Sequence, residues 1–218
     1  MSPIGRLFRN FRGSKSVERD RAAETADGGE VQWVIAGLGN PGDQYRRSRH
    51  NLGFVTLDRI AGKHGVKLSR GRFKSHYARA TIAERAAILV KPENFYNLSG
   101  DSLAPLLGYF KTPVERLIVI HDDLDLEAGR LRLKRGGGDA GNRGVRSIAE
   151  KLGTEFIRIR IGIGRPPGES ESKDFVLKPL SSDELRAFDS AIARAAEAVE
   201  MLMVEDLDRT MSRFNQRA

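Results

Sequence analysis

The sequence contains no cysteine. This absence excludes disulfide bonds, thiolate metal sites and a cysteine nucleophile, and it is compatible with a reducing compartment. No apolar run is as long as a membrane span, and no hydrophobic secretory core stands near the first residue. We therefore expect a cytoplasmic protein that does not associate with membranes.

Positive charge is in excess throughout the chain. The 218 residues include 37 Lys and Arg against 29 Asp and Glu, for a net charge of +8. The first 30 residues hold six basic and five acidic side chains, which leaves 31 against 24, or +7, for the remainder. The charge therefore belongs to the main body of the chain, and it favours an anionic partner, with nucleic acid ahead of membrane.

The length and the 39% hydrophobic content suit one substantial core and are small for two, so we expect a single domain over residues 31–218. Residues 1–30 are interpreted as a basic and polar N-terminal extension that remains disordered. Residues 1–17 place four basic side chains around apolar ones without an acid, which resembles an organelle-targeting peptide. A basic tail that touches nucleic acid weakly is the alternative.

Strand-like and helix-like patterns alternate along the chain. This alternation predicts the α/β class: a single-domain three-layer sandwich with a twisted, mixed β-sheet flanked by helices. Strands are expected at 31–36, 76–82, 86–90, 117–120, 130–134 and 156–163, with a short edge strand at 66–68; helices are expected from 54, from about 99 to 110, and at 145–152, 181–204 and 207–214.

A glycine-rich loop, Gly-Leu-Gly-Asn-Pro-Gly at residues 37–42, follows the first predicted strand. It formally matches the dinucleotide-binding fingerprint, which requires a helix that begins at the third glycine. Pro41 and the polar run to His50 delay the helix, and no acidic residue ends a second strand about 20 residues on. The loop therefore lacks the context for a pyrophosphate, although a general nucleotide-binding protein remains an alternative.

His50 is a candidate general base, because a neutral imidazole can take a proton from water. A single histidine is more often structural, so it needs a partner. Asp122 ends a strand that we expect to lie parallel to the strand ending at Gly37, where its carboxylate could fix the imidazole tautomer. No serine stands in a G-x-S-x-G motif, so water is the expected nucleophile.

Asn40 and Asn97 each lie in a loop after a predicted strand. An asparagine amide has two donors and one acceptor and can hold or polarise a carbonyl group. Turn formation and helix capping are the alternatives, and Asn97 or Ser99 is a natural N-cap for the helix that follows.

The segment His-Asp-Asp-Leu-Asp at residues 121–125 resembles a metal site. Consecutive residues of a strand point to opposite faces, so His121 and Asp122 should diverge. No second cluster stands at ligand spacing, and we therefore expect no metal.

Two alternating strands carry a basic stripe. If they lie side by side, the stripe could grip phosphates next to the glycine loop; a solvated charged face is the alternative. Its members are Arg130, Arg132, Lys134, Arg135, Arg158 and Arg160, with Arg143 and Arg146 nearby.

Together these motifs resemble the bacterial-type peptidyl-tRNA hydrolase family. The first motif comprises residues 37–42 with Tyr45 and residues 49–51, and the second is Phe-Tyr-Asn-Leu-Ser-Gly at 95–100. The third is residues 121–126 with Gly129, and the glycines at 136–138 and the segment 158–164 complete the order. The resemblance covers about residues 31–216.

The resemblance implies a monomeric enzyme that cleaves the ester between a peptide and the terminal ribose of tRNA, without metal or cofactor. It implies His50 as the base for the attacking water and Asp122 as its orienting partner. Asn40 and Asn97 would position the peptide, with Tyr45 and Tyr96 among the substrate-binding residues. Lys134 and Arg160 match the pair that clamps the 5′-phosphate of the tRNA.

One departure from the family lies at residues 138–144, which read Gly-Asp-Ala-Gly-Asn-Arg-Gly where Gly-His-Gly-Gly-His-Asn-Gly is usual. Arg143 replaces the customary asparagine; it could stabilise an oxyanion but cannot accept a proton from water. Asn142 supplies an amide one position early, with a different aim. Tyr96 replaces the usual methionine and is expected to alter a wall of the peptide groove. A family member that binds RNA with weak or no hydrolysis is therefore the second hypothesis.

Overall fold

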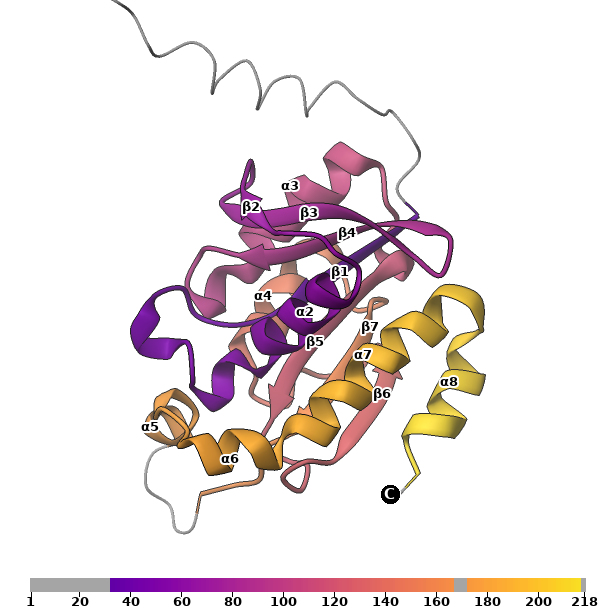
Figure 1. The fold of residues 1–218 in the computed structure, drawn as a ribbon. Coiled ribbons are helices and arrows are strands. Elements are labelled where there is room, and N and C mark those ends of the chain that lie inside the picture. Colours follow the sequence, from indigo (N-terminus) through magenta and orange to yellow (C-terminus); the bar gives the residue numbers. More distant parts are fainter. Residues whose placement is uncertain (1–31, 167–171, 217–218) are drawn as a thin grey trace, which may run out of the picture. The chain divides into compact units, whose positions relative to one another are not determined.

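The computed structural model describes residues 32–166 and 172–216, and in this part of the chain a seven-stranded sheet forms the centre (Figure 1). Its strand order is β2-β3-β4-β1-β5-β7-β6. The four central strands are parallel, and antiparallel strands extend the sheet on both sides. The bounds are β1 (Trp33–Gly37), β2 (Ser69–Arg70), β3 (Ser75–Ile82), β4 (Arg85–Pro92), β5 (Leu117–Asp123), β6 (Leu131–Arg135) and β7 (Ile157–Gly162).

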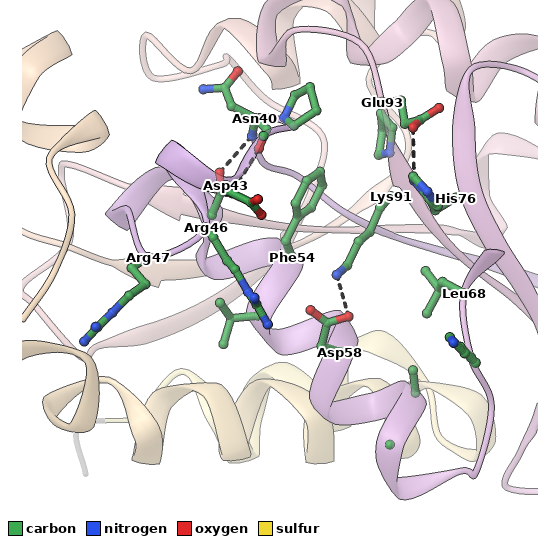
Figure 2. Close-up of a pocket in the computed structure, with 18 of the residues that line it drawn as sticks. Asn40, Asp43, Arg46, Arg47, Phe54, Asp58, Leu68, His76, Lys91 and Glu93 are labelled. Atoms are coloured by element: carbon green, nitrogen blue, oxygen red, sulfur yellow. Dashed lines mark hydrogen bonds and ion pairs between the residues drawn. The ribbon is translucent and has the colours of Figure 1, made fainter. Parts of the chain in front are cut away.

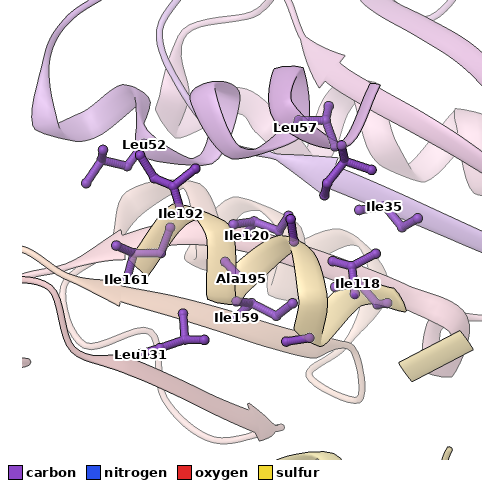
Figure 3. Packing of buried hydrophobic residues seen from close by; sticks show 14 of the residues in the cluster. Ile35, Leu52, Leu57, Ile118, Ile120, Leu131, Ile159, Ile161, Ile192 and Ala195 are labelled. Carbon is purple, nitrogen blue, oxygen red and sulfur yellow. The ribbon is translucent and has the colours of Figure 1, made fainter. Parts of the chain in front are cut away.

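Helices cover both faces of the sheet, and alternate residues of each strand serve the two faces. Ile35 and Ile120 pack with apolar residues of α2 (Leu52–Lys63), α7 (Asp189–Val204) and α8 (Leu207–Phe214), as Figure 3 shows for α2 and α7. Val34 and Val119 pack on the other face, against α3 (Ser99–Phe110) and α4 (Arg143–Leu152). The predicted three-layer α/β sandwich is confirmed.

The parallel pair β1 and β5 brings two distant loops together. Gly37 lies opposite Ile120, and the Leu38 amide donates to the Ile120 carbonyl at 2.9 Å. Every residue of β5 is buried, as expected for a central parallel strand. The glycine-rich loop therefore starts beside His121 and Asp122, at the carboxyl ends of the strands, where open α/β sheets place their sites.

Helix α2 lies unusually close to these two strands at Gly53. A Cβ atom added to Gly53 would lie 2.3 Å from the Ile120 carbonyl oxygen and 2.6 Å from the backbone of Leu38. A Cβ atom on Gly37 would lie 2.4 Å from the Gly53 oxygen. Glycine at both positions allows the contact, which holds the start of α2, and the residues just before it, against the end of β5.

The structure differs from the sequence-based prediction in several places. The edge strand lies at Ser69–Arg70, just after the predicted 66–68. The helix predicted over 181–204 is two helices, α6 (Ser182–Ala187) and α7, which meet at the buried Phe188; α6 begins at a capping box formed by Ser181 and Glu184. The short helix α5 (Ser172–Leu177) was not predicted.

The start of α3 corrects another expectation. Its N-cap position is Leu98, and no side chain caps the helix, so neither Asn97 nor Ser99 has that role. The Ser99 hydroxyl donates to the Tyr96 carbonyl instead, at 2.8 Å. Asn97 therefore remains exposed and available for other contacts.

Helices of the described residues are too short or too polar to cross a membrane. The predictions for residues 1–30 concern a segment outside the described residues.

Replacing Gly53 by alanine tests the close approach of α2. Because the new methyl group would collide with two strands, we expect the free energy of unfolding to fall by about 1–3 kcal/mol. Gly62→Ala is the matched control: it lies in the same helix, is exposed, and its Cβ would meet nothing within 4 Å. That change should raise stability by up to about 1 kcal/mol. Urea unfolding measures both; equal effects would contradict the packing argument.

Candidate active site

Asn40 is fixed by a second asparagine of the same loop. The Asn51 side chain accepts a hydrogen bond from the Asn40 amide at 2.8 Å and donates one to the Asn40 carbonyl at 3.0 Å. The Asn40 Oδ1 atom accepts from the Tyr96 backbone amide at 3.0 Å. Its Nδ2 group makes no hydrogen bond within the described residues, so this end of the amide is free for a substrate.

His50 and Asp122 are brought together as the sequence predicted. The His50 Nδ1 atom lies 2.9 Å from both carboxylate oxygens of Asp122. Asp122 is buried, whereas the His50 side chain is 16% exposed. A carboxylate only accepts hydrogen bonds, so Nδ1 carries the proton and Nε2 is the acceptor. The described residues offer Nε2 no hydrogen-bond partner, so it can accept a proton from outside.

Tyr96 lies beneath this pair rather than along a groove. Only 4% exposed, it offers little surface to a peptide, in contrast to the expected groove wall. Its ring stacks on the His50 imidazole, with centroids 3.5 Å apart and an interplanar angle of 12°. Its hydroxyl donates to Asp122 Oδ1 at 2.8 Å and accepts from Asn142 Nδ2 at 2.8 Å. Tyr96 thus contacts both members of the pair.

The environment fixes the protonation states of Asp122 and Tyr96. Burial alone would raise the pKa of Asp122, but the charge of His50 and hydrogen bonds from His50 and Tyr96 lower it below its ordinary value. Burial, followed by the charge of Asp122, raises the pKa of Tyr96 well above 10.0. At neutral pH the carboxylate is therefore an acceptor and the phenol a donor.

The acidic segment at 121–125 is divided among separate partners. Asp122 binds His50, Asp123 receives the Arg160 guanidinium at 2.7 Å, and Asp125 pairs with Arg165 at 2.5 Å. The His121 Nδ1 atom lies 2.7 Å from the Asp122 carbonyl, and burial lowers the pKa of His121. Within residues 32–166 and 172–216, no group of three or more His, Asp or Glu side chains could hold a metal ion.

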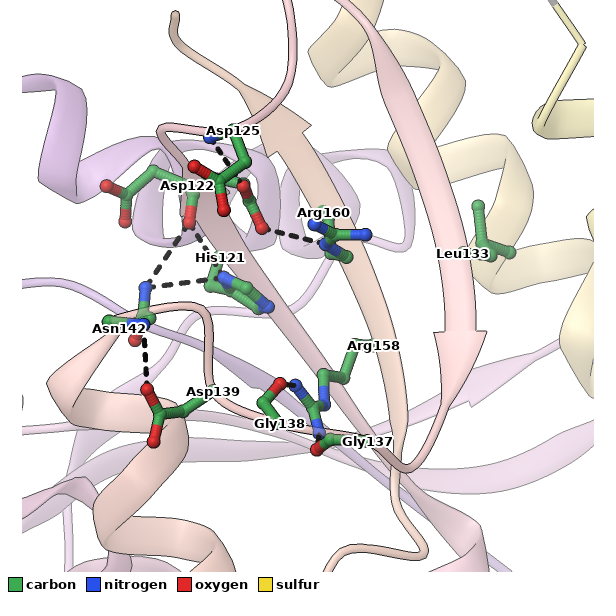
Figure 4. A network of polar contacts seen from close by, with 12 residues as sticks. His121, Asp122, Asp125, Leu133, Gly137, Gly138, Asp139, Asn142, Arg158 and Arg160 are labelled. Atoms are coloured by element: carbon green, nitrogen blue, oxygen red, sulfur yellow. Dashed lines mark hydrogen bonds and ion pairs between the residues drawn. The ribbon is translucent and has the colours of Figure 1, made fainter. Parts of the chain in front are cut away.

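Arg158 corrects the predicted basic stripe. Strands β6 and β7 do pair, with Lys134 opposite Arg158 and Arg132 opposite Arg160. Arg158, however, is only 2% exposed, because the glycine loop folds over it (Figure 4). Its guanidinium donates to the carbonyls of Gly137 and Gly138. It therefore anchors this loop from below instead of facing solvent.

Lys134 and Arg160 remain at the edge of this loop as partly exposed cations. Burial, then the charges of Arg158 and Arg160, lowers the pKa of Lys134. No carboxylate pairs with Lys134 in the described part of the chain, whereas Arg160 is held by Asp123. Such a group of like charges favours an anion between them.

The other predicted residues lie further out. Arg143 is the exposed first residue of α4, and Asn142, just before it, caps that helix: its Oδ1 accepts from the Val145 amide at 3.0 Å. Asn142 therefore reaches Tyr96, while Arg143 does not. Tyr45 is partly buried, and no hydrogen bond or ring contact among the described residues joins it to His50.

A cavity of about 870 Å³ is lined in part by Asn40, Pro41 and Gly42 of the glycine-rich loop (Figure 2). Phe54 and Asp58 of α2 line it together with Lys91, and neither His50 nor Asp122 does. Lys91 pairs with Asp58 at 2.5 Å, and His76 lies 3.5 Å from Glu93. The cavity therefore does not contain the His50–Asp122 pair.

Residues that sequence reasoning missed support the site from below. Asn51 belongs to the first motif, and its position directly after His50 is the one signal for it in the sequence. The role of the Tyr96 hydroxyl had no sequence signal, because its partners lie 26 and 46 residues away.

An α/β sandwich that holds a histidine–aspartate pair at the carboxyl ends of its strands has the layout of a hydrolase that activates water. Residues 34–218 match the family model of peptidyl-tRNA hydrolase. A peptidyl-tRNA hydrolase of Frankia casuarinae is 44% identical over 188 residues, which are 86% of this chain and 95% of the relative. One of Streptomyces coelicolor is 43% identical over 197 residues, covering 88% and 98%.

Solved structures agree. The crystal structure of peptidyl-tRNA hydrolase from Acinetobacter baumannii has a TM-score of 0.81 and 34% identity, and the match covers 87% of this chain and 97% of that one. The chain belongs to the peptidyl-tRNA hydrolase family, which confirms the resemblance drawn from the motifs.

Two asparagine variants test whether Asn51, which holds the Asn40 backbone, contributes to stability while the exposed Asn97 does not. Asn51→Ala would leave the buried amide and carbonyl of Asn40 without partners, so we expect the free energy of unfolding to fall by about 1–3 kcal/mol. Asn97→Ala, at an exposed position, should change it by no more than about 0.5 kcal/mol. Chemical denaturation followed by fluorescence measures both. A stable Asn51→Ala variant would refute the supporting role.

Proposed function

We infer that this family member hydrolyses peptidyl-tRNA at the ester that joins the peptide to the 3′-terminal ribose, releasing peptide and free tRNA. The observation that carries this inference is the orientation of His50. Its Nδ1 is held by the buried, ionised Asp122, and its Nε2 has no partner among the described residues. This is the arrangement of a general base whose tautomer is fixed.

In the proposed reaction, His50 Nε2 takes a proton from a water molecule as the water oxygen attacks the ester carbonyl carbon. Asp122 stabilises the imidazolium that forms. The bond to the ribose oxygen then breaks, and the imidazolium returns its proton to that oxygen. The proposed steps use only side chains of one chain and water, so the proposal is for a monomer that acts without metal or cofactor.

We assign Asn40 and Asn97 to the substrate's carbonyl and peptide backbone. The hydrogen bond from Tyr96 to Asn40 Oδ1 turns Nδ2 outward, so it can donate to the carbonyl oxygen or to the oxyanion. Asn97 directly follows Tyr96 and is exposed. Arg143, exposed at the start of α4, is a further cation that could reach a developing negative charge.

We assign Lys134 and Arg160 to the tRNA 5′-phosphate. Lys134 has no carboxylate partner in the described residues, and the charges of its arginine neighbours are relieved when an anion binds. The net charge of +8 supports the same polyanionic partner.

His50→Ala tests the base. We expect release of peptide from an N-blocked aminoacyl-tRNA to slow by about 10²–10⁴-fold, the usual worth of a positioned base. His64→Ala is the matched control, because that histidine pairs with Glu200 on another side of the molecule and should retain the wild-type rate. Equal rates for His50→Ala and wild type would remove His50 as the base. No activity in either would favour the hypothesis of an RNA-binding protein without hydrolysis.

The phosphate clamp predicts a change in salt dependence. Lys134→Ala combined with Arg160→Ala should weaken tRNA binding and make the slope of log Kd against log salt shallower by about 1–2. Arg59→Ala combined with Lys63→Ala removes the same charge from α2, where both side chains pair with α7. That control should leave the slope unchanged. An unchanged slope in the first variant would reject the clamp.

A further inference from the structure

A directed series of hydrogen bonds runs from α4 to the catalytic pair. The Val145 amide donates to Asn142 Oδ1 at 3.0 Å, so the Nδ2 end of Asn142 faces the site. Nδ2 donates to the Tyr96 hydroxyl oxygen at 2.8 Å. With that oxygen already accepting, the hydroxyl proton points at Asp122 Oδ1, 2.8 Å away. Nδ2 also donates, at a longer 3.3 Å, to the Asp122 backbone carbonyl. The direction of the series is fixed by the cap of the helix.

Tyr96 holds both members of the pair at once. Its hydroxyl and His50 Nδ1 both donate to Asp122 Oδ1. Its ring lies nearly parallel to the imidazole at 3.5 Å. Rotation of either the carboxylate or the imidazole would break a contact with Tyr96.

We propose that Tyr96 and Asn142 are positioning residues of the hydrolytic site, which orient Asp122 and moderate the negative charge that its carboxylate presents to His50. This proposal rests on the proposed function, in which His50 is the base. A hydroxyl donated to the carboxylate stabilises its negative charge, so less of that charge is available to stabilise the imidazolium. Removing the Tyr96 hydroxyl should therefore increase the negative charge with which Asp122 acts on the His50 imidazole.

The protonation of Tyr96 is compatible with this role. Burial, and then Asp122, raises the pKa of Tyr96, so the phenol remains a donor over the range in which histidine titrates. The hydrogen bond is thus constant across a pH profile.

The other charged groups around the His50–Asp122 pair are the same in the wild type and in a Tyr96 variant. His121 and Asp123 flank Asp122 on β5, and the buried Arg158 of β7 faces His121. Arg49, next to His50, pairs with Glu184 at 2.8 Å, and Arg143 of α4 is exposed. A difference between wild type and a Tyr96 variant therefore reports on the hydroxyl.

Tyr96→Phe keeps the stacked ring and removes only the hydroxyl. We expect the acid limb of the pH profile of kcat/KM to move to higher pH by about 0.3–1 unit, the worth of one hydrogen bond to the carboxylate. At neutral pH kcat should fall by roughly 3–10-fold, with KM within about twofold. Tyr109→Phe, at an exposed tyrosine of α3, is the matched control and should leave the profile unchanged.

Asn142→Ser tests the hydrogen bond from Asn142 to Tyr96 separately from the capping of α4. Serine caps helices about as well as asparagine but has no amide donor for Tyr96. We expect a shift in the same direction, smaller than that of Tyr96→Phe, and no additional shift in the double variant, because both act on one hydroxyl. Asp206→Ser makes an equivalent cap exchange on α8 and should shift nothing.

The outcomes are distinguishable. If Tyr96→Phe lowers the rate or the melting temperature but its profile superimposes on that of wild type after scaling, Tyr96 is merely structural and the proposal fails. His50→Ala is assayed in parallel. If His50→Ala is inactive while the Tyr96→Phe profile is unchanged, His50 is retained as the base and only the positioning role of Tyr96 and Asn142 is rejected. If His50→Ala keeps the wild-type rate, both are overturned.

Discussion

The parallel pairing of β1 with β5 is the constraint on which the site depends. It sets the end of β1 level with the end of β5, and the glycines at 37 and 53 let α2 close over both strands. His50 lies two residues before α2, so the same contact that packs the helix brings the imidazole to Asp122. The packing of the core and the geometry of the His50–Asp122 pair therefore depend on the same backbone contact, which the two glycines allow.

Next to this centre, the glycine loop covers a buried arginine, Arg158. No carboxylate of the described residues forms a hydrogen bond with Arg158; its guanidinium donates to the backbone carbonyls of Gly137 and Gly138 instead. The charge of Arg158 acts on Lys134 together with that of Arg160. The buried arginine thus adds to the positive field at Lys134, although it is itself covered.

Hydrophobic patterning predicted most of the fold, because alternation and helical spacing report directly on burial. It located the strands that pair in the centre and hence the meeting of His50 with Asp122. It failed where tertiary contacts decide: Arg158 alternates like a solvated residue but is covered by a loop, and the helix over 181–204 breaks at Phe188. The hydroxyl of Tyr96 could not be placed, since its partners come from two other elements.

Asn142 has one further consequence. Its single amide both caps the first turn of α4 and holds the Tyr96 hydroxyl, so fraying of that turn releases the hydroxyl at the same moment. Local opening of the first turn of α4 is therefore coupled to the orientation of Asp122 through Tyr96. By linkage, a contact that stabilises the Asp122 carboxylate through Tyr96 also stabilises the first turn of α4.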